Sequence, residues 1–560
     1  MVKISLNSRI PKKRIAVVDR DLCTREECGY QCIRVCPVNK SKKDCITIDE
    51  QGYPVISEEL CIGCGICVVK CPFDAIRIVN LDFDFSRTVH SYGVNSFRIY
   101  SLPLPKSNSI VGFLGKNGIG KTTIINILAK KMIPNFDQNI SDWNMAYTKM
   151  TAEERTFFQK DRRVSVKPQN IEQFRTSNVS VGQLLNTLGI SLSEWTHLMD
   201  RKLSELSGGE LQKLLIDIAI SQNAELFYID EPTNFLDVYE RLRYALKIRE
   251  KLEGKDVIVV DHDLAFLDYI ADYVYLFVGE EDVFGFSSEI RAVRNGINEY
   301  MDGFLKSENY RFREQIRFDD YSESDRPQHK LVDYESMDIS VMNFRVHVER
   351  GDIKIGEVIG IVGRNGIGKT SFVRELVNRY NNIKLAYKPQ YIQPSDLYVK
   401  ELNINQNLID MFGIRRSIME RKLKELSGGQ LQKVYTAHVL SQQADLYLLD
   451  EPTAYLDIEN RIRLSKIIRK YATEMGKSVM IVDHDILFLD RVAHRIIVFD
   501  GQPGISGIGS SPMDKREGMN RFLSILNISM RRDPDSNRPR INKPNSVLDR
   551  EQKSTGRFYF

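Results

Sequence analysis

The fold class is most clearly encoded in residues Leu206–Glu231, LSGGELQKLLIDIAISQNAELFYIDE. A glycine pair is followed by an amphipathic run of helical length, and a β-like apolar run then ends at two acidic residues. The stretch occurs twice, because LSGGQLQKVYTAHVLSQQADLYLLDE at residues 426–451 repeats every part of it 220 positions later. The chain therefore contains two copies of one α/β unit, and the remaining segments are read relative to that pair.

Composition places the chain among globular proteins of several domains. Its 560 residues are 42% hydrophobic and carry 79 basic against 75 acidic side chains, which leaves a net charge of +4. That excess is a weak signal for a polyanion partner, although residues 1–22 and 531–560 are each basic by four charges. No apolar run reaches the roughly 18 residues of a membrane span, and no apolar segment follows the basic start. We expect a cytoplasmic protein that does not cross a membrane.

All nine cysteines lie before residue 72, so their function belongs to one N-terminal region of the chain. Eight of them make two runs of four, and each run is closed by a Cys-Pro pair. The second run has the spacing of bacterial ferredoxins, in which the fourth cysteine of each run ligates the other cluster. This pattern predicts two 4Fe-4S clusters with crossed ligand sets, namely Cys61, Cys64, Cys67 and Cys36 for one and Cys23, Cys28, Cys32 and Cys71 for the other.

Two other uses of these cysteines are weaker interpretations. A disulfide framework needs an oxidising compartment, which a chain without a secretion signal disfavours. Zinc could be held by paired C-x2-C motifs, but three closely spaced cysteines followed by Cys-Pro, occurring twice, favour iron–sulfur. The ninth cysteine, Cys45, stands in the β-like run Cys-Ile-Thr-Ile, which favours a buried apolar residue over a ligand.

A P-loop precedes the repeated stretch in each copy. In the first copy a buried-strand pattern leads into Gly115-Lys-Asn-Gly-Ile-Gly-Lys-Thr, and a helical run follows. The glycines let backbone N–H groups point at phosphates, the lysine reaches the β- and γ-oxygens, and the threonine hydroxyl ligates Mg²⁺. The residues expected to bind ATP here are Gly115, Asn117, Gly118, Gly120, Lys121, Thr122 and Thr123 in the first copy and Gly363, Asn365, Gly366, Gly368, Lys369, Thr370 and Ser371 in the second.

Further polar residues at strand ends complete a hydrolytic site in each copy. We expect the aspartate of the Asp-Glu pair in the Mg²⁺ shell, the glutamate as general base for the attacking water, and a strand-end histidine near the γ-phosphate. These residues are Asp230, Glu231 and His262 in the first copy and Asp450, Glu451 and His484 in the second. Tyr92 and Phe97, upstream of the first P-loop, are candidates for stacking on adenine, with ordinary core aromatics as the alternative.

Together these motifs resemble the ATP-binding-cassette (ABC) superfamily. In that superfamily the signature serine of one cassette contacts ATP bound to the other, which implies this role for the signature residues Ser207, Gly209, Ser427 and Gly429. The superfamily's Q-loop glutamine, which helps to place Mg²⁺ and water, matches Gln169 and Gln390. The resemblance implies two P-loop ABC nucleotide-binding domains in tandem, an α/β fold with both sites equipped for catalysis.

Spacing locates one insertion and the domain boundaries. Lys121 and Gln169 are 48 residues apart whereas Lys369 and Gln390 are 21 apart, so the first copy has extra chain near residues 135–163, which we expect to be a helical surface element. The expected units are a ferredoxin-like α+β iron–sulfur domain at 1–80, nucleotide-binding domain 1 at 81–300, a polar connector at 301–335, nucleotide-binding domain 2 at 336–512 and a C-terminal hinge segment at 513–560.

Two cassettes fused to a two-cluster module form a specific combination. It resembles the RNase L inhibitor family of ribosome-recycling ATPases over nearly the whole chain. The motifs that carry this resemblance are Ile62-Gly-Cys-Gly-Ile-Cys, Gly-Ile-Gly-Lys in both P-loops, Gly296-Ile-Asn through Glu308-Asn-Tyr-Arg-Phe-Arg, and Arg538-Pro-Arg-Ile-Asn-Lys. The departures are LSGGQ in place of LSGGE in the second signature, lysine at 213 and 433 in place of arginine, and a short insertion.

The resemblance implies a monomeric ATPase that closes its two cassettes on ATP. It would bind the post-termination ribosome beside a class-1 release factor or its stalled-ribosome paralogue, separate the subunits, and also serve in translation initiation with initiation factors. Contacts with the small subunit and ribosomal RNA would involve the hinge arginines Arg311, Arg313, Arg531 and Arg532. Two other classes stay open: an ATP-coupled electron-transfer protein, and an interaction protein that blocks a nuclease without needing ATP turnover.

Overall fold

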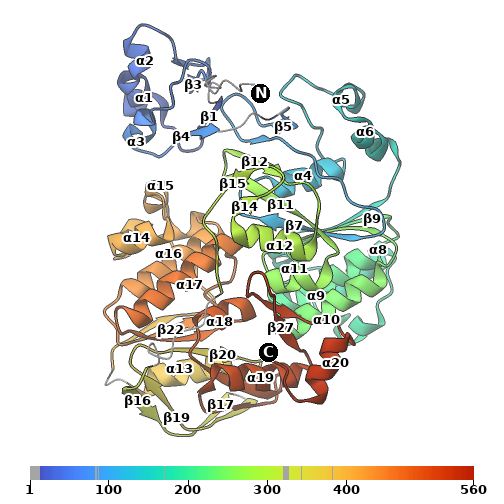
Figure 1. Ribbon diagram of the computed structural model, residues 1–560, viewed down its shortest axis with the longest axis vertical. Coiled ribbons are helices and arrows are strands. Elements are labelled where there is room, and N and C mark those ends of the chain that lie inside the picture. Colours follow the sequence, from blue (N-terminus) through green and yellow to red (C-terminus); the bar gives the residue numbers. More distant parts are fainter. Residues whose placement is uncertain are drawn as a thin grey trace, which may run out of the picture.

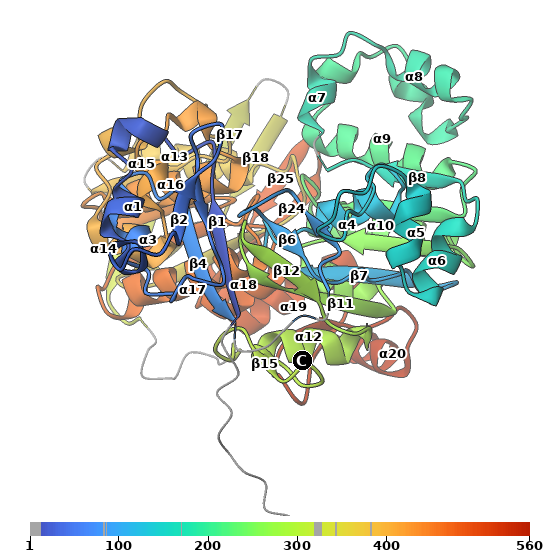
Figure 2. The same ribbon diagram turned by 90° about the horizontal axis from the view of Figure 1, so that it is seen from above.

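The computed structural model describes residues 13–81, 85, 87–169, 171–318, 327–341, 344–380 and 383–560. Figure 1 shows the N-terminal domain (blue) at one end of the molecule, the two cassettes (cyan to green, and yellow to orange) beside each other, and the C-terminal segment (red) running between them. Seen from above, the N-terminal domain lies over the orange helices of the second cassette (Figure 2). Part of the expected polar connector, residues 319–326, falls outside the described residues.

The N-terminal domain is built from two antiparallel strand pairs, β1 (Lys13–Val18) with β4 (Ile76–Leu81) and β2 (Ile46–Ile48) with β3 (Pro54–Ile56). Its short helices are η1 (Arg25–Cys28), α1 (Gln31–Val35), α2 (Pro37–Lys40) and α3 (Ile66–Lys70). Half of the buried side chains in its core cluster are cysteines. So small an apolar core contributes little stability, so the stability of the domain depends on what its cysteines bind.

The first cassette is built on a mixed nine-stranded sheet. Its parallel centre has the order β11-β7-β10-β9-β8, and the inner strands β7, β10 and β9 are nearly continuous apolar runs, as in sheets that helices cover on both faces. The strands are β5 (His90–Ser91), β6 (Arg98–Ile99), β7 (Ile110–Gly115), β8 (Val164–Lys167), β9 (Leu226–Asp230), β10 (Asp256–Val260), β11 (Tyr273–Glu280), β12 (Phe284–Ser287) and β13 (Arg291–Ala292). The helices are α4 (Lys121–Leu128), α5 (Trp143–Lys149), α6 (Ala152–Gln159), α7 (Glu172–Arg175), α8 (Val181–Leu188), η2 (Ser193–Leu198), η3 (Leu203–Glu205), α9 (Gly208–Ser221), α10 (Val238–Lys251), α11 (Leu264–Ile270) and α12 (Val293–Asp302).

The second cassette repeats this plan, with the parallel order β24-β20-β23-β22-β21. Its strands are β16 (Lys330–Tyr334), β17 (Met337–Val341), β18 (Phe344–Val348), β19 (Gly351–Lys354), β20 (Val358–Val362), β21 (Leu385–Lys388), β22 (Leu446–Asp450), β23 (Ser478–Val482), β24 (Arg495–Gln502), β25 (Ser506–Gly509) and β26 (Met513–Asp514). Its helices are α13 (Lys369–Arg379), η5 (Val399–Glu401), α14 (Gln406–Phe412), α15 (Arg416–Met419), η6 (Leu423–Glu425), α16 (Gly428–Ser441), α17 (Ile458–Thr473) and α18 (Ile486–Val492). The expected tandem α/β cassettes are confirmed.

The insertion in the first cassette is a pair of short helices, α5 and α6. Thr151 starts α6 with a capping box, since its side chain accepts from the N–H of Glu154 and the Glu154 side chain accepts from the N–H of Thr151. Phe158 is fully buried, and its ring lies 5.2 Å from that of Trp143. Phe158 belongs to the hydrophobic cluster of the cassette itself and Trp143 packs against it, which anchors the helix pair to the cassette.

The segment expected to be a polar connector differs from that expectation at both ends. A hairpin of β14 (Phe304–Leu305) and β15 (Tyr310–Arg311) begins it, and Ile316 and Phe318 are buried. At its far end β16 pairs with β19, so residues 330–334 belong to the second cassette although the connector was expected to run to 335. The apolar run in Lys-Leu-Val-Asp-Tyr is short and polar residues flank it, so the sequence alone does not indicate a strand there.

Beyond β26 the C-terminal segment contains α19 (Lys515–Leu526), the hairpin of β27 (Met530–Arg532) and β28 (Pro539–Ile541), and α20 (Val547–Ser554). α19 packs on β24 of the second cassette, whereas β28 lies against α11 of the first. The segment thus touches both cassettes.

Candidate ATPase sites and iron–sulfur centre

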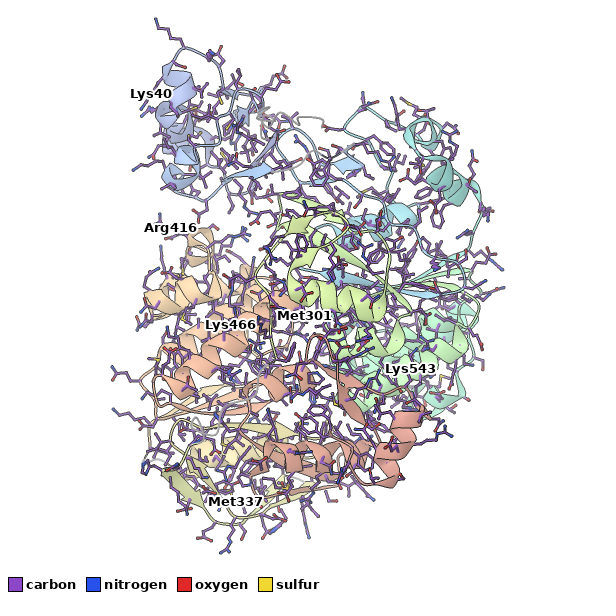
Figure 3. All side chains as sticks on the ribbon, viewed as in Figure 1. Lys40, Met301, Met337, Arg416, Lys466 and Lys543 are labelled. Carbon is purple, nitrogen blue, oxygen red and sulfur yellow. The ribbon has the colours of Figure 1, made fainter. Side chains whose placement is uncertain are left out.

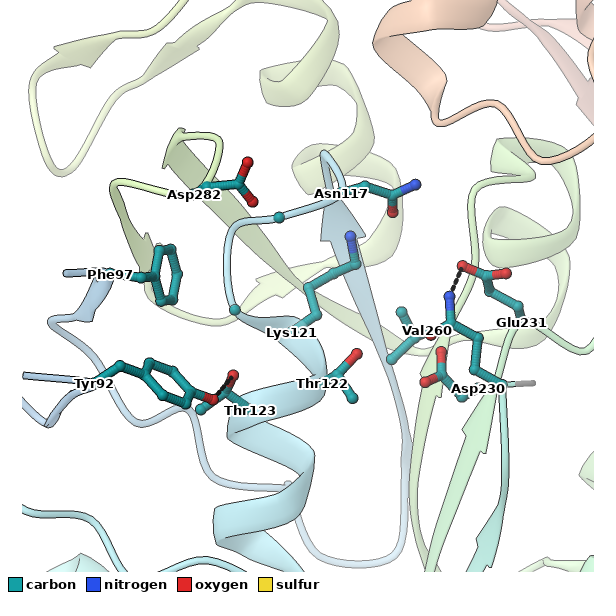
Figure 4. A pocket seen from close by; sticks show the side chains of 13 residues that line it. Tyr92, Phe97, Asn117, Lys121, Thr122, Thr123, Asp230, Glu231, Val260 and Asp282 are labelled. Atoms are coloured by element: carbon teal, nitrogen blue, oxygen red, sulfur yellow. Dashed lines mark hydrogen bonds between the residues drawn. The ribbon is translucent and has the colours of Figure 1, made fainter. Parts of the chain in front are cut away.

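The first P-loop, between β7 and α4, opens onto a hollow at the carboxyl ends of the central strands (Figure 4). Among the described residues, those that line it all come from the first cassette: Tyr92, Phe97, Asn117, Gly118, Gly120, Lys121, Thr122, Thr123, Gln169, Asp230, Glu231, Val260 and Asp282. Tyr92 and Phe97 stand on one wall, 6.3 Å apart between ring centres, and the Tyr92 hydroxyl lies 2.9 Å from that of Thr123. The hollow therefore gathers the P-loop, the Asp-Glu pair and the two expected adenine-stacking rings.

Each P-loop lysine is folded back onto its own loop. Lys121 Nζ donates to the carbonyls of Gly115 at 2.8 Å and Lys116 at 2.5 Å. Lys369 Nζ does the same in the second cassette. Burial lowers the pKa of Lys121 to about 8 and also lowers the pKa of Lys369. An anion beside either ammonium would reverse this shift, so the loops are built to receive phosphate.

The aspartates at the strand ends are buried carboxylates. Burial raises the pKa of Asp230 to about 7, with the adjacent Glu231 adding to the shift. Burial raises the pKa of Asp450 to about 6, although the Thr370 hydroxyl donates to Asp450 Oδ2 at 2.8 Å and opposes the shift. Asp450 Oδ1 is buried and has no hydrogen-bond partner among the described residues. A partnerless carboxylate oxygen beside a threonine hydroxyl fits a hard cation such as Mg²⁺.

The neighbouring glutamates are held by the Q-loop glutamines. Gln169 Nε2 donates to Glu231 Oε1 at 2.8 Å, and Gln390 Nε2 donates to Glu451 Oε1 at 2.7 Å. The histidines His262 and His484 place Nε2 at 3.6 and 3.4 Å from the same oxygens.

These neighbours set the protonation of each site. Burial would raise the pKa of Glu451, but the hydrogen bond and charge of His484 and the charges of Lys369 and Lys388 hold it at about 2. Burial lowers the pKa of His262 well below its ordinary value, with Lys121 adding to the shift. At the second site, a carboxylate that these neighbours keep ionised can accept a proton from water.

Each Asp-Glu pair is held by two buried side chains that the sequence motifs did not single out. Lys167 Nζ donates to the carbonyl of Asp230 at 2.7 Å and Gln212 Nε2 donates to that of Glu231 at 2.7 Å. Lys388 and Gln432 do the same for the second pair. Both glutamates adopt positive φ, +44° and +46°, in which non-glycine residues are strained. The lysines and glutamines therefore brace a strained turn, and their recurrence at matching offsets in both copies was the available signal.

The signature residues lie apart from the hollow of the first site. Ser207 and Ser427 each cap their own fourteen-residue helix, α9 or α16, accepting from the N–H of Glu210 or Gln430. Two contacts between the cassettes join a P-loop to a helix-capping aspartate of the other cassette. The N–H of Asn117 donates to Asp457 Oδ2 at 3.1 Å, and the N–H of Asn365 donates to Asp237 Oδ2 at 2.8 Å. Each P-loop is thus already touched by the opposite cassette, and neither signature serine is among the described residues that line the first hollow.

The eight cysteines of the two runs surround two separate cavities. Cys36, Cys61, Cys64 and Cys67 line one, and Cys23, Cys28, Cys32 and Cys71 line the other. Cys45 also lines the first cavity and is 1% exposed, and burial raises the pKa of its thiol to about 12. The grouping has the crossed pattern expected for ferredoxin-like ligand sets.

Comparisons with known proteins agree with this layout. Residues 101–234 and 395–454 match the ABC transporter family, and residues 54–77 match the 4Fe-4S binding domain family. An ABC transporter ATP-binding protein of Methanocaldococcus jannaschii is 41% identical over 98% of this chain and 97% of its own length. Translation initiation factor RLI1 of Chaetomium thermophilum is 37% identical over 98% of this chain and 97% of its own. A chain in the structure of ribosome-bound archaeal Pelota and ABCE1 superposes with a TM-score of 0.91, at 42% identity, over 98% of this chain and 100% of that one.

This chain belongs to the RNase L inhibitor (RLI1/ABCE1) family. It is therefore an ABC-type ATPase that binds ATP and carries a 4Fe-4S binding domain, as expected. Within the described part of the chain, no helix has the length and apolar character needed to span a bilayer.

In this family member the loop before β6 binds the iron–sulfur domain to the first cassette. Asn95 follows Tyr92 in that loop, and its amide donates to the carbonyls of Ala16 and Ile56 while accepting from the N–H of Ile56 at 2.7 Å. Nearby, Arg98 Nη1 donates to both carboxylate oxygens of Glu58, at 2.8 and 2.9 Å. These contacts couple movement of the loop to movement of the iron–sulfur domain.

The hinge arginines differ from the contacts that the resemblance implied. Arg313 donates to the carbonyl of Tyr300 and pairs with Glu459 of the second cassette at 3.0 Å. Arg532 pairs with Asp490 at 3.0 Å, and Arg531 donates to Asn542. These three guanidinium groups all have partners within the protein in this arrangement. Arg311 is exposed, over the ring of Phe304.

Proposed function

We propose that this chain is an ATP-driven ribosome-recycling factor. It binds post-termination ribosomes in the cytoplasm together with a class-1 release factor or its stalled-ribosome paralogue, and it separates the subunits when its two cassettes close. The observation that carries the proposal is the agreement along 98% of the chain with a protein bound to the ribosome beside Pelota. We further propose contacts with the small subunit and its RNA, and a role with initiation factors in translation initiation, since an RLI1 relative is named for that role.

Each nucleotide site is assigned its roles from the contacts described above. Lys121 and Lys369 bind the β- and γ-phosphates, and Tyr92 and Phe97 stack on adenine in the first site. Thr122, Asp230 and Gln169 hold Mg²⁺ there, as Thr370, Asp450 and Gln390 do in the second site; the ion, when bound, neutralises phosphate charge. Glu231 and Glu451 take the proton of the attacking water, and the histidines His262 and His484 keep these carboxylates oriented.

Closure of the cassettes is the proposed working stroke. The two P-loops already contact Asp457 and Asp237 across the interface, and closure brings the helix N-termini at Ser207 and Ser427 toward the phosphates. Those N-termini carry partial positive charge that favours an anion. Gly209 and Gly429 lie in the first turn of these helices and leave backbone N–H groups accessible. ATP then bridges the cassettes and hydrolysis removes the bridge.

We propose that the cysteines hold two 4Fe-4S clusters in crossed ligand sets. Among the described residues, no three metal-binding side chains lie close enough together to hold a single metal ion, whereas four sulfurs surround each cavity. Such spacing supports a cluster over a lone zinc. Bound clusters cross-link a domain that has little apolar core of its own, so it can act as a stiff lever during closure.

Subunit separation tests the proposal directly. Post-termination ribosomes are incubated with the anaerobically reconstituted protein, with or without ATP, and analysed on sucrose gradients. We expect separation that requires ATP and is lost when Lys121 and Lys369 are both changed to alanine. Ribosomes that stay intact despite full iron loading and rapid ATP turnover would contradict recycling and favour ATP-coupled electron transfer. Nuclease inhibition that survives changing Glu231 and Glu451 to glutamine would identify an activity independent of turnover.

A further inference from the structure

An acidic turn, Glu281–Asp282, lies on the rim of the first nucleotide site. It connects β11 to β12 in the first cassette. The N–H of Asp282 donates to the carbonyl of Gly118 in the P-loop at 2.9 Å, and the Asp282 side chain lines the hollow beside Phe97 (Figure 4). Any nucleotide bound at Lys121 therefore has this carboxylate within its surroundings.

The equivalent turn of the second cassette is uncharged. There Pro503–Gly504 connects β24 to β25, and the N–H of Gly504 donates to the carbonyl of Gly366 at the same distance, 2.9 Å. The backbone contact with the P-loop is thus shared by both copies, and the two carboxylates belong to the first copy alone. A role common to all P-loops does not explain them.

Both carboxylates are contacted by arginines from other domains. Arg77, on β4 of the iron–sulfur domain, donates to the carbonyl of Glu281 at 2.5 Å and lies 3.3 Å from Asp282 Oδ2. Arg415, beside α15 of the second cassette, donates to Glu281 Oε2 at 2.9 Å and lies 3.6 Å from Asp282 Oδ2. Two domains that must move relative to the first cassette are therefore joined at one turn.

A further contact joins the iron–sulfur domain directly to the second cassette, beside the Glu281–Asp282 junction. Asp74 of the iron–sulfur domain accepts from the N–H of Ser417, in α15, at 3.0 Å. Figure 3 shows Arg416 at the end of the second cassette that faces the iron–sulfur domain. A hollow between that domain and the first cassette shares Tyr92, Phe97 and Asp282 with the nucleotide pocket, so the junction borders the place where the base would lie.

We propose that Glu281–Asp282 is a charge latch. It ties the iron–sulfur domain and the second cassette to the rim of the first nucleotide site, and ATP binding at that site loosens it. The charge of the nucleotide repels Asp282 and competes for Arg77 and Arg415. By linkage, a latch that ATP weakens must itself weaken ATP binding by the same factor. The second site, with Pro503–Gly504, has no such coupling.

We expect the latch to change the docking equilibrium and the ATP affinity only modestly, because its side chains are partly exposed. Glu281, Asp282 and Arg415 retain 46%, 54% and 34% of their side-chain exposure. Ion pairs of this kind change an equilibrium by about two- to fivefold each, and salt screens them. The inference rests on the proposed nucleotide site at Lys121, so its test needs one measurement without nucleotide and one with it.

The measurement without nucleotide uses the full chain carrying its clusters, with donor and acceptor dyes introduced through noncanonical residues at the exposed positions Lys40 and Lys466 (Figure 3). Changing Glu281→Pro and Asp282→Gly together copies the turn of the second cassette, and glycine suits the φ of +58° at Asp282. We expect the fraction of molecules with the docked dye distance to fall about two- to fivefold per lost pair. Glu281→Arg should lower it further through repulsion of Arg415, and adding Arg415→Glu should restore it. Glu474→Ala, which breaks an exposed pair with Lys470, is the matched control.

The measurement with nucleotide uses a Lys369→Ala background, in which ATP binding reports the first site. The turn replacement should tighten ATP binding about two- to fivefold, by reciprocity with the docked fraction. An unchanged dye distance in all turn variants would overturn the latch. A changed distance with unchanged ATP affinity would overturn its coupling to nucleotide. No ATP binding in the Lys369→Ala protein would instead contradict the proposed site, and the dye distances without nucleotide would still decide whether the turn ties the domains together.

Discussion

At the scale of single residues, the bracing of the catalytic turn makes a sharp prediction. Lys388 Nζ donates to the carbonyl of Asp450 at 2.6 Å and to that of Glu451 at 3.2 Å. Changing Lys388→Met keeps the length of the side chain and removes both donors and the charge that stabilises ionised Glu451. We expect ATP turnover at the second site to fall about ten- to hundredfold, with ATP affinity nearly unchanged. Turnover and calorimetric binding in a Lys121→Ala background measure the two quantities.

Lys384→Met is the matched control for this prediction. Lys384 lies four residues earlier, and its side chain is exposed. Its replacement should leave turnover within about twofold, because exposed substitutions rarely act on a distant site. Equal turnover in the Lys388→Met and Lys384→Met proteins would show that the brace is dispensable.

The P-loop lysine of the first site makes a prediction about pH. The pKa of Lys121 is lowered to about 8 by burial, and bound phosphate favours the charged ammonium and raises that pKa again. A group whose pKa rises on binding weakens binding as the pH increases between its two pKa values. ATP affinity in a Lys369→Ala protein should thus be flat below pH 8 and fall by up to about tenfold per pH unit above it. Titration calorimetry in buffers of different ionisation enthalpy should detect uptake of a proton at pH 9; affinity independent of pH from 7 to 9.5 would refute the assignment.

Motif chemistry predicted well which residues gather at each site, and less well what holds them. Strand-loop-helix context brings Lys121, Asp230 and Glu231 to one edge of the sheet, so their proximity follows from topology. The roles of Lys167 and Gln212 depend on carbonyl groups that point at them only after the strained turn has formed. No composition or periodicity encodes such a contact, because both residues are polar and look exposed in the sequence.

At the scale of elements, the C-terminal hairpin is clamped onto the first cassette by a buried charge network. Asp268 of α11 accepts from Arg538 at 3.0 Å and from Arg540 at 2.7 and 2.8 Å, and Arg538 is fully buried. Changing Asp268→Ala leaves the buried Arg538 without its carboxylate partner and leaves Arg540 with Asp533 alone, a loss of about 3–5 kcal/mol for a buried pair. Hydrogen exchange in residues 527–545 should show a local opening free energy lowered by about that amount.

An exposed carboxylate in the same segment provides the comparison. Asp535 pairs with Arg294 at 2.8 Å, but its side chain is 70% exposed. Asp535→Ala should change the opening free energy by less than about 1 kcal/mol. If both substitutions accelerate exchange equally, the buried network is not what holds the hairpin.

Elements with strong periodicity were predictable, and short ones stabilised by distant partners were not. α9 and α16 are encoded locally by a capping serine and a continuous amphipathic run. β16 gains its identity only by pairing with β19, and Arg313 was expected to face RNA yet reaches Glu459 in another domain. Such partners lie far along the chain, so they cannot be predicted from the local sequence.

At the scale of the whole molecule, the two cassettes meet through reciprocal contacts that the 220-residue repeat alone does not specify. Asp237 and Asp457 each use one carboxylate oxygen to cap a helix of their own cassette and the other to accept from a P-loop N–H of the opposite cassette. Each nucleotide site is therefore completed by an aspartate from the other half of the chain.

This arrangement predicts that substitutions act across the interface. Serine at 237 or 457 keeps the helix cap, since serine caps about as well as aspartate, and removes the contact with the opposite P-loop. Asp237→Ser should slow turnover about tenfold in a Lys121→Ala protein, where the second site works, and should leave a Lys369→Ala protein nearly unaffected. Asp457→Ser should show the reverse pattern. Unchanged melting temperatures would exclude a general loss of stability as the cause. Slower turnover at the site in the same cassette as the substitution would mean that the crossed contacts do not support catalysis, and that each cassette works with its own parts alone.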